Sequence, residues 1–366
     1  MATMKKWIPH WLGMPRLDPV MLLLIGLVMA VGLFMVYSAS GQNPALVERQ
    51  AIRLGLGLVA MLVLSQVPPH ILRAWTPWLY LAGLILLVAT WFFGVGRGAQ
   101  RWLDLGIFRF QPSEIMKLAV PMMLAWYLHS RLLPPTLRDV AVALAMIVAP
   151  AFLIARQPDL GTAMLVAVSG GFTLFLAGIR WRVIASMAGI AVAAAPLLWM
   201  GMKEYQRNRV RTFLDPDADP LGQGWNIIQS KIAVGSGGLT GKGWLGGTQS
   251  RLEFIPERHT DFILAVFSEE FGFLGVALLL LLYLAVIARG LFVASLARDT
   301  YSRLLAGSLA LILFVYVIVN GGMVSGLLPV VGVPLPLISY GGTSAVTLLA
   351  SIGIMMSVYG HRKFIH

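Results

Sequence analysis

The stretch RLEFIPERHTDF, from Arg251 to Phe262, gathers carboxylates, basic side chains and a histidine immediately before an apolar run. Only 12% of the chain is charged, so this concentration is unusual. Asp261 is the carboxylate next to the apolar run. An ionised carboxylate that reaches a substrate hydroxyl can act as a general base. The same position, beside Thr260, also suits a helix cap, where free N–H groups and the helix dipole favour a carboxylate. The two roles are compatible.

Glu257 and His259 flank Asp261 and are predicted to support it as polar residues of the loop. A zinc site would need further His or Cys ligands at suitable spacing. The chain has 0 Cys, and no such set of histidines is present, so zinc is not expected. A weak site for a divalent cation, Mg or Mn, on Asp261 and neighbouring oxygens stays open.

Charged residues also occur inside apolar segments. Glu114 and Lys117 are three residues apart in QPSEIMKLA, and Glu269 follows Asp261 in the next apolar segment. Ionisable groups at membrane depth are costly, so they normally face the bundle interior, paired or beside a water-filled cavity. A structural ion pair is the favoured interpretation for Glu114 and Lys117. Glu269 falls on nearly the same helix face as Asp261, which predicts a polar cavity leading down from Asp261.

Several cations accompany these acids. Arg207, Arg209 and Arg211 lie in QRNRVRTFLDP, and Arg101 lies in RGAQRWLDLG. A further acid, Asp159 in ARQPDLGTA, is expected at a membrane edge. Arginine is suited to bidentate phosphate contacts. The alternative is contact with lipid headgroups. Cations and a carboxylate on one side of the membrane fit a substrate that has a diphosphate leaving group and is attacked by a hydroxyl.

Two glycine-rich stretches have different meanings. GKGWLG, from Gly241 to Gly246, matches G-x-G-x-x-G but lacks the strand and helix that a nucleotide site requires, so no nucleotide is expected. No haem is expected either. The stretch from Asn320 to Ala345, NGGMVSGLLPVVGVPLPLISYGGTSA, brings glycine, proline and serine into an apolar region. Irregular backbone is tolerated at membrane depth only when it is buried in protein or lines a cavity. The second stretch therefore indicates a cavity.

Composition sets the elements that must position these groups. The chain is 366 residues long and 58% hydrophobic, with a mean hydropathy of +0.80. Soluble domains are about 45–50% apolar and about 25% charged. We therefore predict an all-α polytopic membrane protein, with residues 1–366 as one membrane domain. About ten transmembrane helices are predicted, at 18–38, 50–66, 75–94, 112–130, 138–155, 160–178, 183–200, 261–288, 303–324 and 338–360.

Lysine and arginine in short loops predict the orientation. The predicted cytoplasmic segments hold Lys5, Lys6, Arg16, Arg73, Arg131, Arg138, Arg180, Arg182, Arg289, Arg298, Arg303, Arg362 and Lys363. The opposite short loops and their flanks hold fewer, namely Arg49, Arg53, Arg97, Arg101, Arg109 and Arg156. Both termini are therefore predicted to be cytoplasmic, and 201–260 to be a large extracytoplasmic loop between the seventh and eighth helices.

The long loop is predicted to contain a short helix along the membrane surface, in GWNIIQSKIAVGS. Its apolar residues at helical spacing are Trp225, Ile228 and Ile232. The net charge of +12 is attributed to membrane topology and anionic lipid. No basic helix interleaved with aromatic residues is present, so no nucleic acid is expected as a partner.

Three motifs resemble those of the SEDS family (shape, elongation, division and sporulation) of bacterial cell-wall proteins. They are QPDLGTA, GSGGLTGKGWLGGTQSRLEFIPERHTDFILAVFSEEFGFLG and PLPLISYGGTS. The form GTQSRLEFIPERHTDF, with short termini, resembles the elongation type. The resemblance implies a peptidoglycan glycosyltransferase of the bacterial cytoplasmic membrane that polymerises lipid II. It also implies a class B penicillin-binding transpeptidase and other elongation-complex membrane proteins as partners, and support by a divalent cation.

The resemblance makes Asp261 the expected catalytic residue. The residues expected to bind substrate are Arg101, Arg207, Arg209, Arg211, Lys117, Glu114, Asp159, His259, Glu257 and Ser339. An inverting transfer needs one base on the face of the nucleophile. A diphosphate leaving group needs charge stabilisation more than protonation, so one carboxylate with nearby cations is sufficient. The alternatives are a lipid II flippase and a non-catalytic scaffold of the elongation machinery.

Overall fold

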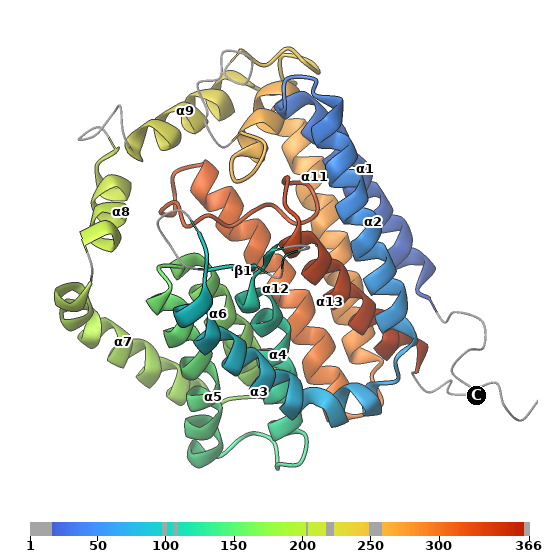
Figure 1. Cartoon of the computed structure of the whole chain (residues 1–366), viewed down its shortest axis with the longest axis vertical. Coiled ribbons are helices and arrows are strands. Elements are labelled where there is room, and N and C mark those ends of the chain that lie inside the picture. The colour runs from blue at the N-terminus through green and yellow to red at the C-terminus, as the bar shows by residue number, and fades with distance from the viewer. Residues whose placement is uncertain are drawn as a thin grey trace, which may run out of the picture.

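The structure is a computed structural model that describes residues 17–96, 101–104, 106, 109–202, 204–216, 223–248 and 258–361. It is a bundle of α-helices in which each of the ten predicted spans is occupied by a helix (Figure 1). These helices are α1 (Pro19–Ala39), α2 (Pro44–Gln66), α3 (Pro69–Phe93), α4 (Pro112–Leu128), α5 (Leu137–Arg156), α6 (Leu160–Leu176), α7 (Trp181–Gly201), α11 (Ile263–Ser295), α12 (Thr300–Val324) and α13 (Thr343–Gly360). The all-α prediction is confirmed.

The helices begin where local sequence satisfies their free N–H groups. Asp18 precedes a proline at the start of α1 and accepts hydrogen bonds from the N–H groups of Val20 and Met21, at 3.1 and 3.3 Å. Thr136 and Asp139 form a reciprocal capping box at the start of α5. Such caps stabilise a helix end by about 1 kcal/mol. The predicted boundaries are therefore close to the observed ones for these helices.

Six helices are long and apolar enough to cross a membrane by length and composition, namely α1, α3, α5, α11, α12 and α13. Two shorter apolar helices, Leu160–Leu176 and Trp181–Leu197, belong to α6 and α7. Two further helices carry charge near their N-termini: Glu48, Arg49 and Arg53 in α2, and Glu114 and Lys117 in α4. These charges lie where the functional groups gather, so they weaken the apolar signal of these two helices.

The helix α12 lies at the centre of the bundle. It is the most buried of the six long apolar helices and packs against α4, α6, α11 and α13. The helix α2 packs along α13. In contrast, none of the described side chains of α7 is buried. Figure 1 shows α7 continuing into α8 (Glu204–Leu214) and α9 (Gln223–Ser236) as an arc along one side of the bundle.

The long segment between α7 and α11 contains the predicted short helix, now α9. Ile227, Ser230 and Ala233 are buried, whereas Ile232 is 45% exposed and Ile228 is half-buried. The helix α9 packs against α11 and α12, and Ser230 donates a hydrogen bond to the carbonyl of Val324 at 2.9 Å. Tertiary packing, and not apolar spacing alone, selects the buried face.

A small antiparallel hairpin lies between α3 and α4 and was not predicted. Its strands are β1 (Leu103–Asp104) and β2 (Arg109–Phe110), with Leu103 paired to Phe110 and Asp104 to Arg109. An isolated bridge between Val95 and Trp102 extends the pairing toward the end of α3. Arg101, just before the hairpin, contacts the segment from Gln157 to Asp159 at the start of α6.

Candidate active site

A cavity of about 640 Å³ lies at the end of the bundle where the chain enters α4, α6, α11 and α13. Its lining comes from the hairpin, from the first turns of α4 and α6, from α8 and from the segments around α11 and α13. The lining residues are Arg101, Trp102, Gln111, Glu114, Lys117, Asp159, Thr162, Leu165, Arg209, Thr260, Asp261, 331–334 and 340–344. The cavity predicted from the glycine- and proline-rich stretch is therefore confirmed.

Asp261 lines this cavity from a turn that precedes α11. The helix begins at Ile263 with Phe262 as its N-cap, and the N-cap side chain makes no capping hydrogen bond. The helix therefore begins two residues after the predicted start at 261, and Phe262, not Asp261, is its N-cap residue. The reason is that tertiary contacts hold this turn out of helical conformation, so Asp261 projects from a loop toward the cavity.

Two buried side chains hold the Asp261 turn to the segment after α12. Asn320, at 0% exposure, donates hydrogen bonds from Nδ2 to the carbonyls of Asp261 and Val333, both at 2.8 Å. The Ser339 hydroxyl donates to the carbonyl of Thr260 at 2.6 Å. The two Asn320 bonds join α12 to irregular segments and the Ser339 bond joins two irregular segments, so three backbone carbonyls in the bundle are satisfied. Asn320 therefore fixes the backbone of Asp261 from the central helix.

The segment after α12 is held in turn by Gln50 of α2. Its amide nitrogen donates to the carbonyl of Ser339 and its amide oxygen accepts from the N–H of Gly341, both at 3.2 Å. Gly332 of this segment has a φ of +73°, and a Cβ there would lie 3.5 Å from Oδ2 of Asp261. Glycine at this position keeps the space in front of the carboxylate open and adopts the left-handed conformation without strain.

Glu114 and Lys117 form the predicted ion pair. Their side chains are 6% and 7% exposed, and Lys117 Nζ lies 2.7 Å from Glu114 Oε1. Lys117 also donates to the hydroxyl of Tyr316 on α12 at 2.6 Å. Among the described residues, Glu114 Oε2 has no hydrogen-bond partner. The pair joins two helices and also lines the cavity, so a polar group of a ligand can reach it.

Asp159 and Arg101 form a second polar cluster on the cavity wall. Asp159 caps α6 by accepting from the N–H of Thr162 at 3.3 Å, and it also accepts from Gln111 Nε2 at 3.1 Å. Arg101 donates to the carbonyls of Gln157, at 3.2 Å, and Pro158. Its NH1 lies 3.9 Å from Asp159 Oδ1. The cap explains the position of Asp159, and the cluster holds the guanidinium of Arg101 at the wall.

The N-terminus of α13 also faces the cavity. Gly342 is its N-cap residue and provides no capping side chain. The residues from Gly341 to Ser344 line the cavity. The first N–H groups of a helix have no partner within the helix, and together with the helix dipole they favour an anion. Three groups with positive character, namely Arg101, Arg209 and this helix end, therefore surround a cavity that also contains Asp261.

The three arginines predicted from the long loop are not brought together. Arg209 lines the large cavity. Arg207 donates to the carbonyls of Trp199, at 3.1 Å, and Met200, at 2.8 Å, at the end of α7. Arg211 pairs with Glu204 at 3.0 Å on an exposed face. Residues two positions apart on a helix point to nearly opposite sides, so Arg209 of α8 points away from Arg207 and Arg211. The structure therefore supports a site role for Arg209 and none for the other two.

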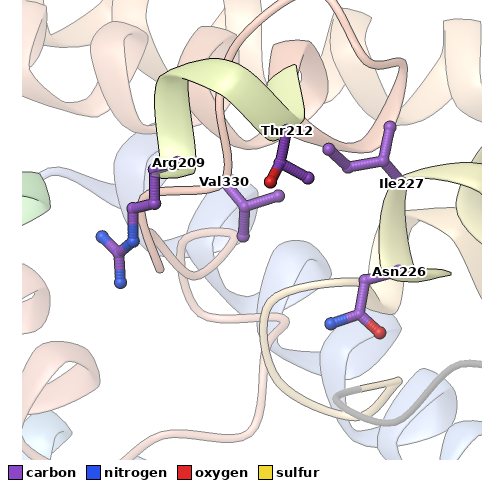
Figure 2. Close-up of a pocket in the computed structure, with 5 residues that line it drawn as sticks. All are labelled: Arg209, Thr212, Asn226, Ile227 and Val330. Carbon is purple, nitrogen blue, oxygen red and sulfur yellow. The ribbon is translucent and has the colours of Figure 1, made fainter. Parts of the chain in front are cut away.

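Arg209 also lines a smaller cavity of about 170 Å³ between α8 and α9. Figure 2 shows Arg209 and Thr212 of α8 and Asn226 and Ile227 of α9 around Val330. Because Arg209 belongs to both linings, it lies between the two cavities. No residue of this smaller cavity other than Arg209 was predicted from the sequence.

Other predicted residues lie beside the cavity and do not line it. The His259 ring packs edge-on against the Tyr340 ring, with centroids 5.7 Å apart, and the backbone carbonyl of His259 accepts from the Tyr340 N–H at 2.8 Å. Ser339 acts through Thr260, as described above. Glu257 lies outside the described residues. Glu269 does not line the cavity and lies 2.7 Å from Lys242, so the prediction of a cavity leading from Asp261 to Glu269 was wrong.

Within the described part of the chain there is no group of three or more His, Asp or Glu side chains that could hold a metal ion. Asp261 and Asp159 are the aspartates among the residues that line the cavity. Mg²⁺ commonly binds through one or two carboxylates, with waters and substrate phosphates as its remaining ligands. The residues present fit a cation shared with a substrate and do not fit a preformed protein cage.

The comparison with known families identifies the chain. A family profile described as "Cell cycle protein", of the FtsW, RodA and SpoVE proteins, matches residues 18–364. The chain belongs to the SEDS family. Among SEDS relatives, it is 54% identical over 352 residues to the peptidoglycan glycosyltransferase MrdB of Escherichia coli strain K12, covering 96% of this chain and 95% of that protein. It is 34% identical to the stage V sporulation protein E of Bacillus subtilis strain 168, covering 95% and 98%.

Solved SEDS structures share the fold. A chain of a peptidoglycan synthase complex that coordinates polymerization and crosslinking superposes with a TM-score of 0.83 at 36% identity, covering 94% of this chain and 98% of that one. The rod shape determining protein RodA of Thermus thermophilus superposes with a TM-score of 0.73 at 30% identity, covering 97% and 99%. The agreement extends over nearly the whole chain, so the fold is that of an integral membrane SEDS protein.

Proposed function

We propose that Asp261 is the general base of glycan-strand polymerisation. The chain is a peptidoglycan glycosyltransferase that acts in cell elongation, in agreement with its 54% identity to a protein of that activity and its likeness to a rod shape determining protein. The observation that carries the proposal is the placement of Asp261 in one cavity with Arg101, Arg209 and the N-terminus of α13. The cavity thus contains both a base that can accept the proton of the nucleophile and positive groups that can stabilise an anionic leaving group.

The substrate that fits this arrangement is lipid II, in which a disaccharide-peptide is linked to a polyprenyl diphosphate. The diphosphate would lie toward Arg209, Arg101 and the first turn of α13, where guanidinium groups and free N–H groups favour phosphate oxygens. The acceptor sugar would present its hydroxyl to Asp261. The cavity volume of about 640 Å³ lies within the range of small-molecule sites. The polyprenyl chain is apolar and would remain in the bilayer.

The chemistry needs one proton acceptor. The acceptor hydroxyl oxygen attacks the anomeric carbon of the donor, its proton passes to the Asp261 carboxylate, and the bond between that carbon and the diphosphate oxygen breaks. The diphosphate leaves with the bonding electron pair, stabilised by fixed positive groups in a site shielded from water. Attack opposite the leaving group inverts the configuration at the anomeric carbon, so no second catalytic carboxylate is required.

A divalent cation is proposed as an aid to this reaction. Asp261, with Asp159 on the facing wall, would supply carboxylate oxygens, and the substrate diphosphate would supply others. When bound, such a cation would neutralise charge on the leaving group. The residues of the chain would still orient the substrate, and the cation would add to the stabilisation from Arg101 and Arg209.

The partner and the location are proposed on related grounds. One SEDS chain of the same fold comes from a complex that coordinates polymerization with crosslinking, which supports a class B penicillin-binding transpeptidase as the partner here, within a larger elongation complex. The positions of lysine and arginine in short loops support a cytoplasmic-membrane protein with both termini in the cytoplasm. The cavity would then open on the side where cell-wall polymerisation takes place.

Polymerisation by purified protein with its transpeptidase partner and lipid II tests the base. The wild-type protein should form glycan strands, and Asp261→Asn, which has the same shape but accepts no proton, should abolish them. Equal rates for the two proteins would refute the assignment.

Movement of lipid II across vesicles without polymer would favour a flippase, and intact cell-wall assembly with Asp261→Ala would favour a scaffold. Addition of EDTA tests the cation, since full activity in EDTA would remove it from the proposal.

A further inference from the structure

The helix α11 is interrupted close to Asp261. Gly272 has φ 63° and ψ −165°, which is not a helical conformation. The break separates a short segment, 263–271, from a long segment, 273–295. Asp261 lies immediately before the short segment. Because helical hydrogen bonds do not continue through the break, the long segment does not by itself determine where the short segment and Asp261 lie.

Residues 237–248, here called the insert, occupy the break. In a continuous helix the carbonyls of Glu269 and Glu270 would accept from the N–H groups four residues later. The insert supplies the missing partners on both sides of the break. The four bonds are Lys242 N to Glu269 O at 3.0 Å, Gly243 N to Glu270 O at 3.0 Å, Phe273 N to Gly238 O at 2.9 Å and Leu274 N to Leu239 O at 3.0 Å.

Glycines allow this close approach. A Cβ on Gly237 would lie 2.0 Å from the carbonyl oxygen of Ser268, and one on Gly241 would lie 2.1 Å from that of Glu270. A Cβ on Gly272 would lie 2.4 Å from Gly241 N. All three distances are far below van der Waals contact. Within the stretch GKGWLG, it is Gly241 that makes this close approach to the broken helix.

Side chains lock the insert to the short segment. Glu269 is 0% exposed, and its Oε1 lies 2.7 Å from Lys242 Nζ. The same oxygen accepts from the N–H and hydroxyl of Thr248, at 2.8 and 2.9 Å. Lys242 Nζ also donates to the Thr248 hydroxyl at 2.9 Å. A buried carboxylate persists at membrane depth because it is paired and hydrogen-bonded in this way.

The insert and the Asp261 turn are both attached to the end of α1. Three contacts make this attachment: the Trp244 ring stacks on Phe34 with centroids 4.4 Å apart, Ser38 donates to Glu270 Oε1, and Arg258 Nε donates to the carbonyl of Ala39 at 2.8 Å. The chain before Asp261 is thus held at Thr248 and again at Arg258. The insert, the C-terminal end of α1 and the short segment form one unit that ends at Asp261.

We infer that the Lys242–Glu269 pair is a positioning element for Asp261, which sets the reach of the carboxylate without touching substrate. The inference rests on the proposed role of Asp261. The reasoning is mechanical: loss of the pair removes the Lys242 cation from the buried Glu269 carboxylate and weakens the attachment of the insert to the short segment. The turn that carries Asp261 then has fewer constraints. A displacement on the order of 1 Å at a reacting group can lower turnover about 100-fold.

The test compares Lys242→Met with Lys242→Arg in the reconstituted polymerisation assay, at temperatures below unfolding and per amount of folded protein. Lys242→Met should lower kcat on the order of 10- to 100-fold while KM for lipid II changes little. Lys242→Arg keeps the charge and should restore most of the turnover. Thr248→Val removes one hydrogen bond to the same oxygen, is milder for folding, and should lower kcat by a smaller factor.

Asp18→Asn is the matched control. Asp18 pairs with Arg289 at 2.7 Å, and their side chains are 1% and 20% exposed. Arg289 lies in the long segment of α11, on the other side of the break from Glu269. It should lower the melting temperature and leave kcat unchanged. The inference is overturned if Lys242→Met loses stability but keeps kcat, as the control does, or if it raises KM alone. Asp261→Asn in the same assay separates the two claims, since full activity there removes the base whatever Lys242 does.

Discussion

Breaking the Glu114–Lys117 pair should have unequal effects from its two sides. The side chains are 6% and 7% exposed and 2.7 Å apart. Lys117→Met leaves the Glu114 carboxylate buried with no cation, and breaking a buried pair in this way costs about 3–5 kcal/mol. Glu114→Gln leaves Lys117 bonded to the Tyr316 hydroxyl at 2.6 Å. That loss corresponds to a hydrogen bond to a charged group, about 1.5–3 kcal/mol.

These energies translate into melting temperatures that can be measured. With an unfolding entropy of about 2.1 cal/mol/K per residue, a chain of this length loses roughly 4–6 °C for Lys117→Met and about 2–4 °C for Glu114→Gln. The assay is thermal unfolding of detergent-purified protein. The double variant Glu114→Gln with Lys117→Met has no charge left at either of these two positions, and it should therefore melt above the Lys117→Met variant. Turnover should fall in all three, because both residues line the cavity.

The double variant supplies the decisive result. If it melts at or below Lys117→Met, the two residues do not stabilise each other, and the interpretation as a structural pair is refuted. If all three variants melt with the wild type but lose turnover, the pair serves the cavity and not the bundle. If they lose stability and keep turnover, the cavity role fails.

The remaining predictions follow from the same geometry. Arg209→Ala should raise KM for lipid II or lower kcat by 10-fold or more in the polymerisation assay, on the order of one lost charge-assisted contact. Arg211→Ala should change either constant by less than about threefold, because the Arg211 side chain pairs with Glu204. Asn320→Leu removes two hydrogen bonds of 2.8 Å and leaves two buried carbonyls without partners. It should lower stability by about 2–6 kcal/mol and lower kcat, and normal values of both would contradict its role in holding the Asp261 turn. Ile227→Asp should destabilise the protein or lower its expression, because Ile227 is 2% exposed, whereas Ile232→Asp at 45% exposure should be tolerated. The reverse order would contradict the buried face of α9 in the structure.

The parts of the site that could be predicted from the sequence are those encoded by local spacing. Glu114 and Lys117 lie on one helix face at i, i+3, so their pairing follows from helix geometry. Asp159 precedes a helix and was expected at a membrane edge. The glycine- and proline-rich stretch indicated a cavity because such backbone is tolerated at membrane depth only in a restricted setting.

The errors all concern contacts between distant segments. Asp261 was predicted to begin α11 because Thr and Asp are common at helix starts, but the helix begins at Ile263, and Asn320 and Ser339 bond the carbonyls of the turn before it. Glu269 was predicted to lie on the same helix face as Asp261 because the helix was assumed to start at 261, whereas it starts at Ile263, and Lys242 of the insert pairs with Glu269. Gln50 and Asn320 were missed because isolated amides in apolar segments have no local signal of function.

The sequence by itself determined the class of protein and the chemical groups available. Long apolar runs require helices in a bilayer, and the concentration of charge at RLEFIPERHTDF marks where polar chemistry occurs. The tertiary structure alone decided which groups face one another. Asp261 meets Arg209, Arg101 and the start of α13 only because α4, α6, α8 and α13 converge on one cavity. The physical reason is that helix periodicity is local, whereas the convergence of distant segments depends on packing and on the need to satisfy every backbone group within the bundle.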